Sequence, residues 1–183
     1  MPRLSPVRPP FDDDTAQALE LLGPPIALFR LFARRPARAR AIHGWGRYYL
    51  SRQSALSLRH RELVIDRTTA LCGAEYEWGI HITAFAAKAG LTGAQVASTA
   101  TGGPDDPCWT DDADRTVLRT VDALHESGDL SDAQWDALLD AVGEEAAIDL
   151  LLMCGWYHAI SFVARVIRLP REPDTPGFPA GPG

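Results

Sequence analysis

The amino-acid sequence predicts an all-α protein, a single helical domain of about eight helices. Three observations support this prediction. Stretches typical of β-strands are nearly absent, glycines and prolines separate segments with helical periodicity, and Ser, Thr or Asp residues stand where many of these segments begin. With 183 residues, 46% of them hydrophobic, the chain is long enough to bury one sizeable core, which we assign to residues 1–169.

The first half of the chain has signals for five helices. Asp12 to Asp14 open the first, and Gly23-Pro24-Pro25 ends it. Pro36 is compatible with the first turn of the third helix, and Ser57 is a good N-cap for the fourth. The predicted segments are residues 12–22, 26–35, 36–50, 57–71 and 75–89, the last followed by Gly90.

The second half of the chain begins two helices with a capping box. Thr92 with Gln95, and Ser131 with Gln134, have the spacing in which the first side chain and the fourth bind each other's backbone. The predicted segments are residues 92–101, 110–127 with Thr110 as cap, 131–142 and 144–169.

The last segment is apolar nearly all round, which predicts a central, buried helix. His158 and Arg165 interrupt its most apolar part, so we do not expect it to span a bilayer. The tail that follows, residues 170–183, is rich in Pro and Gly and has little apolar content to pack. We expect this tail to be disordered.

The charge of the chain is unevenly distributed. Its net charge of -6 argues against nucleic acid as a partner. Arginines concentrate in residues 30–67 and aspartates in residues 105–140. Such halves usually neutralise each other within a fold or across subunits; the narrower alternative is an anionic substrate attracted to the basic half.

The three cysteines, Cys72, Cys108 and Cys154, have neither a CxxC nor a metal-binding spacing. An odd count without a signal peptide fits a protein of the reducing cytoplasm. We expect Cys72, at the end of a helix, to be a small buried side chain rather than a nucleophile.

Glu77 and His81 are the most informative pair in the sequence. Residues four positions apart on a helix lie on the same face within touching distance, so a carboxylate and an imidazole could share a proton or act on one bound molecule. The alternative is an ordinary surface pair worth a few tenths of a kcal/mol.

Four segments carry a family resemblance: RELVI at residues 61–65, CGAEYEW at 72–78, AGLT at 89–92 and LLLMCGWYH at 150–158. Together with His81 they resemble the carboxymuconolactone decarboxylase family, which includes the alkylhydroperoxidase-D-like proteins. The resemblance covers a family core at residues 55–169. It implies an alkylhydroperoxidase-D-like fold and assembly into a homo-oligomer, as a dimer, trimer or hexamer.

The redox thiols of the peroxidase branch of this family are absent. That branch has a glutamate, a CxxC pair and a histidine, which align here with Glu62, Ala74, Glu77 and His81. Disulfide-based peroxide reduction therefore has no chemical basis at these positions. The decarboxylase branch, with a glutamate and a histidine in the spacing of Glu77 and His81, is more similar and implies no metal or organic cofactor.

The resemblance implies a cofactor-independent decarboxylase, a carbon-carbon lyase that acts on a small anionic lactone or enolisable acid. In this reading His81 is the main proton donor or acceptor, Glu77 orients and charge-balances it, and Glu62 is a secondary carboxylate. Arg47 and Arg61 are the candidates for holding substrate carboxylates. Tyr76 and Trp78 are further candidates for substrate contact, although such aromatics are more often core or interface residues.

The sequence is also compatible with other functions. The protein could be a peroxide-handling member of the family, a biosynthetic isomerase or dehydratase using the same site, or a non-catalytic oligomeric scaffold that binds a ligand. A metal held by Glu62, Glu77 and His81 is geometrically possible, but the resemblance argues against it. The remaining histidines, His43, His125 and His158, are interpreted as structural. The expected partners are a small anionic organic substrate and further copies of the chain, with no nucleic acid and no membrane.

Overall fold

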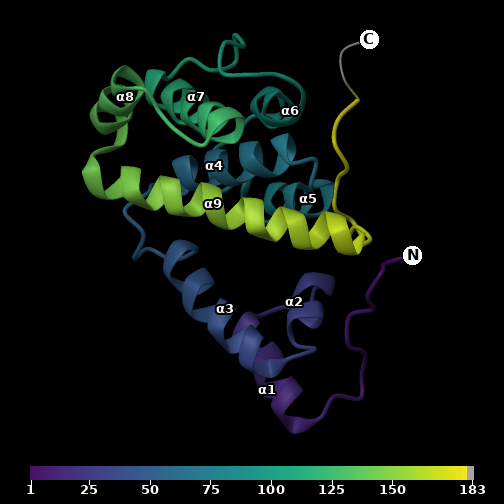
Figure 1. Cartoon of the computed structure of the whole chain (residues 1–183). Coiled ribbons are helices and arrows are strands. Elements are labelled where there is room, and N and C mark those ends of the chain that lie inside the picture. The colour runs from purple at the N-terminus through teal and green to yellow at the C-terminus, as the bar shows by residue number, and fades with distance from the viewer. Residues whose placement is uncertain (181–183) are drawn as a thin grey trace.

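The computed structural model describes residues 1–180 and is helical without strands over that range (Figure 1). The all-α prediction is confirmed, with nine helices in the described range rather than about eight. They are α1 (Asp13–Leu22), α2 (Ala27–Phe32), α3 (Pro36–Tyr49), α4 (Leu58–Leu71), α5 (Glu75–Phe85), α6 (Gly93–Thr101), α7 (Asp112–Ser127), α8 (Asp132–Val142) and α9 (Glu144–Ile167).

Local capping signals fix most helix ends where the sequence predicts them. Both capping boxes, at the start of α6 and of α8, are formed, and the Ser57 side chain accepts a hydrogen bond from the backbone of His60. Some ends differ from the prediction. Helix α2 ends at Phe32 instead of residue 35, α5 at Phe85 instead of Ala89, and α9 at Ile167 instead of Leu169. Asp111 rather than Thr110 caps α7.

Helix α9 crosses the molecule between two groups of helices (Figure 1). On one side it packs with α4, α7 and α8 around a core that includes Leu63, Val117, Leu138 and Leu150. On the other side a second core joins α1, α2 and α3 to the C-terminal half of α9 and to Tyr76 of α5. The candidate site lies between these two groups.

Ion pairs between α4 and α7 bring the basic and acidic halves of the sequence together. Arg59 binds Asp114 with an N–O distance of 2.7 Å, and Arg67 binds Asp122 at 2.6 Å. The expectation that the two charged halves neutralise each other within the fold is met at these pairs. Buried pairs of this kind fix how two helices pack because breaking one would leave a charge without compensation.

Helix α9 has the length and composition of a membrane span, a criterion that the core helix of a globular protein also meets. It packs against α4, α5 and α8, and its buried residues belong to both cores. These contacts support the interpretation of α9 as a core helix. Its outer face exposes Ile148, Leu152, Phe162 and Val166.

The C-terminal tail differs from the prediction of disorder. Residues 170–180 lie against the helices, and residues 181–183 are outside the described part of the chain. Glu172 accepts a hydrogen bond from the Tyr76 hydroxyl at 2.8 Å, and the Phe178 ring lies 5.4 Å from that of Trp78. Composition alone missed these contacts because two or three well-placed side chains are enough to anchor a short segment.

At Gly79 of α5 the backbone of the tail passes close to the helix. A Cβ atom added there would collide with the backbone oxygen of Pro176. Exchange of Gly for Ala inside a helix usually stabilises it by roughly 0.5–1 kcal/mol, because Gly is the more flexible residue. We expect Gly79→Ala instead to detach the tail while the helices remain folded.

Limited proteolysis followed by mass spectrometry measures this effect as faster cleavage within residues 170–180. Gly44→Ala is the matched control, because Gly44 lies in α3 with nothing within 4 Å of the added atom. Equal cleavage rates in both variants and the parent protein would show that the tail is not held at Gly79.

Candidate functional site

A cavity of about 580 Å³ lies between α1–α3 on one side and α5, α9 and the tail on the other. Its wall is mostly apolar, with side chains such as Leu28, Phe32, Ile80 and Trp156. A small number of polar side chains interrupt this wall: His43, Arg47, Glu77, His81, Thr83, Tyr157, Glu172 and Thr175. An apolar pocket with a few polar groups is the usual form of a small-molecule site.

His81, on α5, is held at both ring nitrogens. Its Nδ1 lies 2.9 Å from Glu62 Oε2 on α4, and its Nε2 lies 3.0 Å from the Tyr157 hydroxyl on α9. The other Glu62 oxygen accepts a hydrogen bond from Arg61 Nε at 2.9 Å and forms an ion pair with Arg61 Nη2 at 2.8 Å. Three helices therefore contribute to one buried chain of hydrogen bonds.

The donor and acceptor roles in this chain follow from the charges. Arg61 is a permanent cation, and its ion pair with Glu62 favours the ionised carboxylate. An ionised carboxylate only accepts hydrogen bonds, so the proton of neutral His81 lies on Nδ1. The free lone pair on Nε2 then accepts a hydrogen bond from the Tyr157 hydroxyl. Burial, together with Glu77 and Glu62, raises the pKa of Tyr157 well above its usual value, so this phenol keeps its proton.

Glu77 lies in the first turn of α5 and borders the cavity, although only 4% of the residue is exposed. Its Oε1 atom is buried and has no hydrogen-bond partner among the described residues. Burial raises the pKa of this carboxyl to about 7; nearby His81 opposes the shift and Glu172 adds to it. Glu77 is therefore an acid that titrates near neutral pH at the wall of a cavity.

Comparison with known proteins supports the family expected from the sequence. Residues 36–104 match the model of the carboxymuconolactone decarboxylase family. This segment is similar to the carboxymuconolactone decarboxylase family. It includes α3 to α6 and therefore Glu62, Glu77 and His81.

A solved structure extends the similarity to the whole fold. A crystal structure of an uncharacterized peroxidase-related protein from Silicibacter sp. TM1040 superposes with a TM-score of 0.81, covers 94% of each chain and is 15% identical. At this identity the likeness concerns the fold. It supports the alkylhydroperoxidase-D-like architecture, in which α1, α2 and α7–α9 extend the matched family segment. No curated protein matches the chain.

Within this site, the two carboxylates have a different arrangement from the one expected. Glu62, not Glu77, makes the hydrogen bond that orients His81, and both nitrogens of His81 are occupied without Glu77. Spacing along one helix placed Glu77 and His81 on the same side, where both border the cavity. It did not reveal the contact from α4, which depends on how two helices pack.

Only one of the four predicted substrate-binding residues, Arg47, lines the cavity. Arg47 is exposed and lines the cavity, as a carboxylate-binding side chain would. Arg61 lies behind the cavity wall, paired with Glu62 and above the Phe85 ring. Tyr76 and Trp78 are outside the lining. Tyr76 donates its hydroxyl to Glu172, and Trp78 donates its indole N–H to Thr99 at 3.1 Å.

Two residues of the site were not singled out from the sequence. Tyr157 lies 76 positions from its partner His81 in the chain, within the segment that carried the family resemblance. Glu172 belongs to the tail that was expected to be disordered. Its only sequence signal is that it is an acidic residue in an otherwise Pro-rich stretch.

Proposed function

We propose that this protein is a general acid/base lyase of the carboxymuconolactone decarboxylase family that decarboxylates a small lactone acid or enolisable acid. The observation that carries the proposal is Glu77, a buried carboxyl at the cavity wall with a free oxygen and a pKa of about 7. At neutral pH such a group is present in both protonation states. It can give a proton to carbon and regain one from solvent.

In the proposed reaction Glu77 transfers the proton, and His81 with Tyr157 stabilises negative charge. Loss of CO2 breaks a carbon–carbon bond and leaves the electron pair in an enolate or dienolate conjugated with the substrate carbonyl. Protonated Glu77 donates a proton to the carbon that lost CO2. When the substrate is bound, the Tyr157 hydroxyl donates its hydrogen bond to the substrate oxygen instead of to Nε2 of His81 and stabilises the developing charge there. Glu62 keeps the His81 ring in place beside Tyr157.

The shape and polarity of the cavity support a substrate with an apolar body and one or two acidic groups. The wall between α1–α3 and α9 supplies apolar contacts, and Arg47 supplies a cation with no ion-pair partner among the described residues. A guanidinium binds a carboxylate through two parallel hydrogen bonds, which would orient the acid in the cavity.

The alternatives receive less support from the site. None of the three cysteines lines the cavity, and burial raises the pKa of both Cys72 and Cys154, which disfavours the reactive thiolate that peroxide reduction needs. For a non-catalytic scaffold we would expect Glu77 and His81 to be sealed away from any cavity, and here both border one. Isomerisation or dehydration would use the same groups, so substrate tests must separate them.

The test is release of CO2 from 4-carboxymuconolactone by the purified protein and by its His81→Ala variant. Loss of one group that stabilises a developing oxyanion typically costs a factor of about 10² to 10³, and His81 contacts the Tyr157 hydroxyl, so we expect the variant to lose at least about 100-fold in kcat/KM. His60→Gln is the matched control, because His60 lies outside the cavity. Full turnover by His81→Ala would contradict the proposed mechanism, and no release by the parent protein would reject this lactone as substrate.

A further inference from the structure

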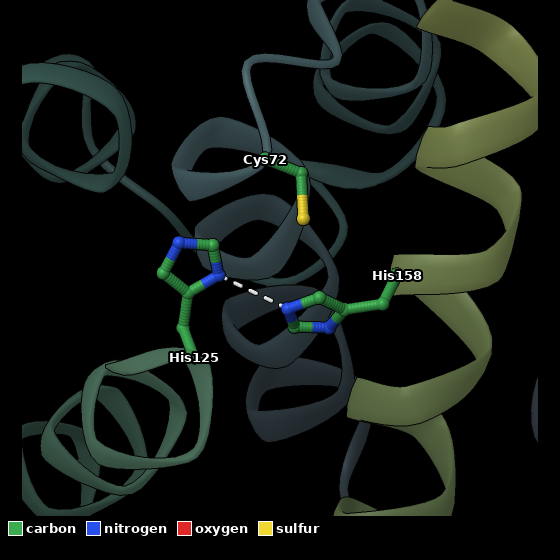
Figure 2. A group of neighbouring side chains, drawn as sticks. All are labelled: Cys72, His125 and His158. Carbon is green, nitrogen blue, oxygen red and sulfur yellow. Dashed lines mark hydrogen bonds between the residues drawn. The ribbon is translucent and has the colours of Figure 1, made fainter. Parts of the chain in front are cut away.

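Three side chains that are distant in sequence converge on one point outside the cavity. Cys72 at the C-terminal end of α4, His125 on α7 and His158 on α9 point toward one another (Figure 2). One ligand atom from each lies within 4.8 Å of the other two, and no second group of this kind occurs in the part of the chain that the structure describes. Cys72 is buried, His158 is half-buried and His125 is exposed.

The orientation of His158 is the one that a metal ligand needs. Its Nδ1 lies 2.9 Å from the backbone oxygen of Cys154, one helical turn earlier, and donates a hydrogen bond to it. This bond places the proton on Nδ1 and leaves the lone pair of Nε2 directed into the cluster. Metal-binding histidines are commonly fixed in this way through their second nitrogen.

The two imidazoles already face each other through nitrogen atoms. His125 Nδ1 lies 3.0 Å from His158 Nε2, and one proton is shared between them (Figure 2). Two nitrogens and a sulfur bound to one tetrahedral zinc ion would lie roughly 3.3–3.6 Å apart. The distance between the two nitrogens would lengthen by a few tenths of an ångström, and the sulfur–nitrogen distances, which are at most 4.8 Å, would adjust as the side chains close around the ion.

The Cys72 thiol keeps its proton when no cation is bound, because burial raises its pKa. The guanidinium of Arg165 donates a hydrogen bond to the Cys72 backbone oxygen at 2.6 Å and so fixes the end of α4 that carries this thiol. A metal ion would supply the missing positive charge.

We propose that Cys72, His125 and His158 form a zinc site with one thiolate ligand, two imidazole ligands and a fourth position open to solvent. On binding, Sγ of Cys72 forms a bond to Zn²⁺ and releases its proton to solvent. The proton between the imidazoles moves to Nε2 of His125, which frees Nδ1 to bind the ion. No electron transfer is involved.

The site joins the end of α4 to α7 and α9, and His158 directly follows Tyr157, which contacts His81. Its expected role is therefore to fix the packing of these three helices. It is separate from the proposed lyase chemistry, because none of its ligands lines the cavity. Failure of the decarboxylase proposal would leave this inference untouched.

The test uses the full-length protein, stripped of metal and kept reduced, titrated with Zn²⁺ and with Co²⁺ as a spectroscopic substitute. We expect binding of one ion per chain, a rise in Tm with Zn²⁺, and with Co²⁺ a thiolate-to-metal charge-transfer band in the near ultraviolet. Loss of any ligand is expected to weaken Zn²⁺ binding by more than about 100-fold. The reason is that loss of a side chain that only orients a metal ligand already weakens metal binding by about 10- to 100-fold.

Three ligand variants and two controls complete the experiment. His125→Gln changes an exposed residue and is the variant least able to disturb folding, while Cys72→Ser and His158→Gln test the buried ligands. Cys108→Ser and His60→Gln, outside the cluster, are expected to bind as the parent does. Cobalt binding without a charge-transfer band, or unchanged Zn²⁺ affinity in His125→Gln, would overturn the proposal.

Discussion

Glu77→Gln is expected to make the protein more stable above pH 7 and, at the same time, to remove its proposed activity. In the folded protein burial raises the pKa of Glu77 from 4.5 to about 7, which favours the protonated acid. The stability that this preference contributes is fully present below pH 4.5 and is lost as the pH rises through 7. This difference between the pKa values of the unfolded and the folded state corresponds to roughly 3 kcal/mol in the free energy of unfolding.

The variant should therefore match the parent in free energy of unfolding near pH 4.5 and exceed it by up to about 3 kcal/mol near pH 8. Urea unfolding of both proteins across this pH range measures the difference. If the difference did not change with pH, the pKa of Glu77 would be the same in the folded and the unfolded chain, and Glu77 could not be the proposed proton donor near neutral pH. In the CO2 assay the same variant should lose about 10² to 10⁴ in kcat, since glutamine cannot donate to carbon.

Asp66→Asn is the matched control for separating stability from activity. Asp66 is a second buried carboxyl, both of its oxygens lack a hydrogen-bond partner, and burial raises its pKa well above the usual value. It does not line the cavity. We expect Asp66→Asn also to gain stability at high pH, while turnover stays within a few-fold of the parent, so loss of activity would be specific to Glu77.

Glu62→Gln is expected to be among the most destabilising single changes in this protein. The carboxylate of Glu62 is the partner of buried Arg61, and glutamine of the same shape would leave that guanidinium without compensation. Removing one member of a buried pair typically costs about 3–5 kcal/mol. That is a large part of the 5–15 kcal/mol or so that stabilises an ordinary domain.

A double variant distinguishes the loss of the ion pair from a general packing defect. Arg61→Met combined with Glu62→Gln removes both charges and keeps a side chain that can accept the His81 proton, so most of the lost stability should return. Asp14→Asn, which breaks the exposed pair of Arg40 and Asp14, should cost less than about 1 kcal/mol. Denaturant unfolding of all four proteins gives these values. A cost below about 1 kcal/mol for Glu62→Gln would mean that Arg61 reaches water.

Local features of the sequence were sufficient to predict most of the secondary structure. N-caps such as Ser57 and the two capping boxes act within four residues, so their effect on helix ends can be read directly from the chain. The i,i+4 spacing of Glu77 and His81 likewise placed both at the wall of one cavity.

The exchange of roles between Glu62 and Glu77 depended on the packing of α4 against α5. Which carboxylate reaches His81 is decided by the angle and offset of two helices, and these follow from the fit of many side chains rather than from any spacing. The same holds for Tyr157, for the tail that Glu172 and Phe178 anchor, and for the cluster of Cys72, His125 and His158.

The sequence by itself therefore determined the helices, the family and the set of ionisable residues available for chemistry. Only the tertiary structure decided which of these residues touch, which are buried and which face the cavity. The physical reason is that capping and helical periodicity act over a few residues, whereas the pKa of Glu77 and the partners of His81 arise from burial and contacts between distant segments.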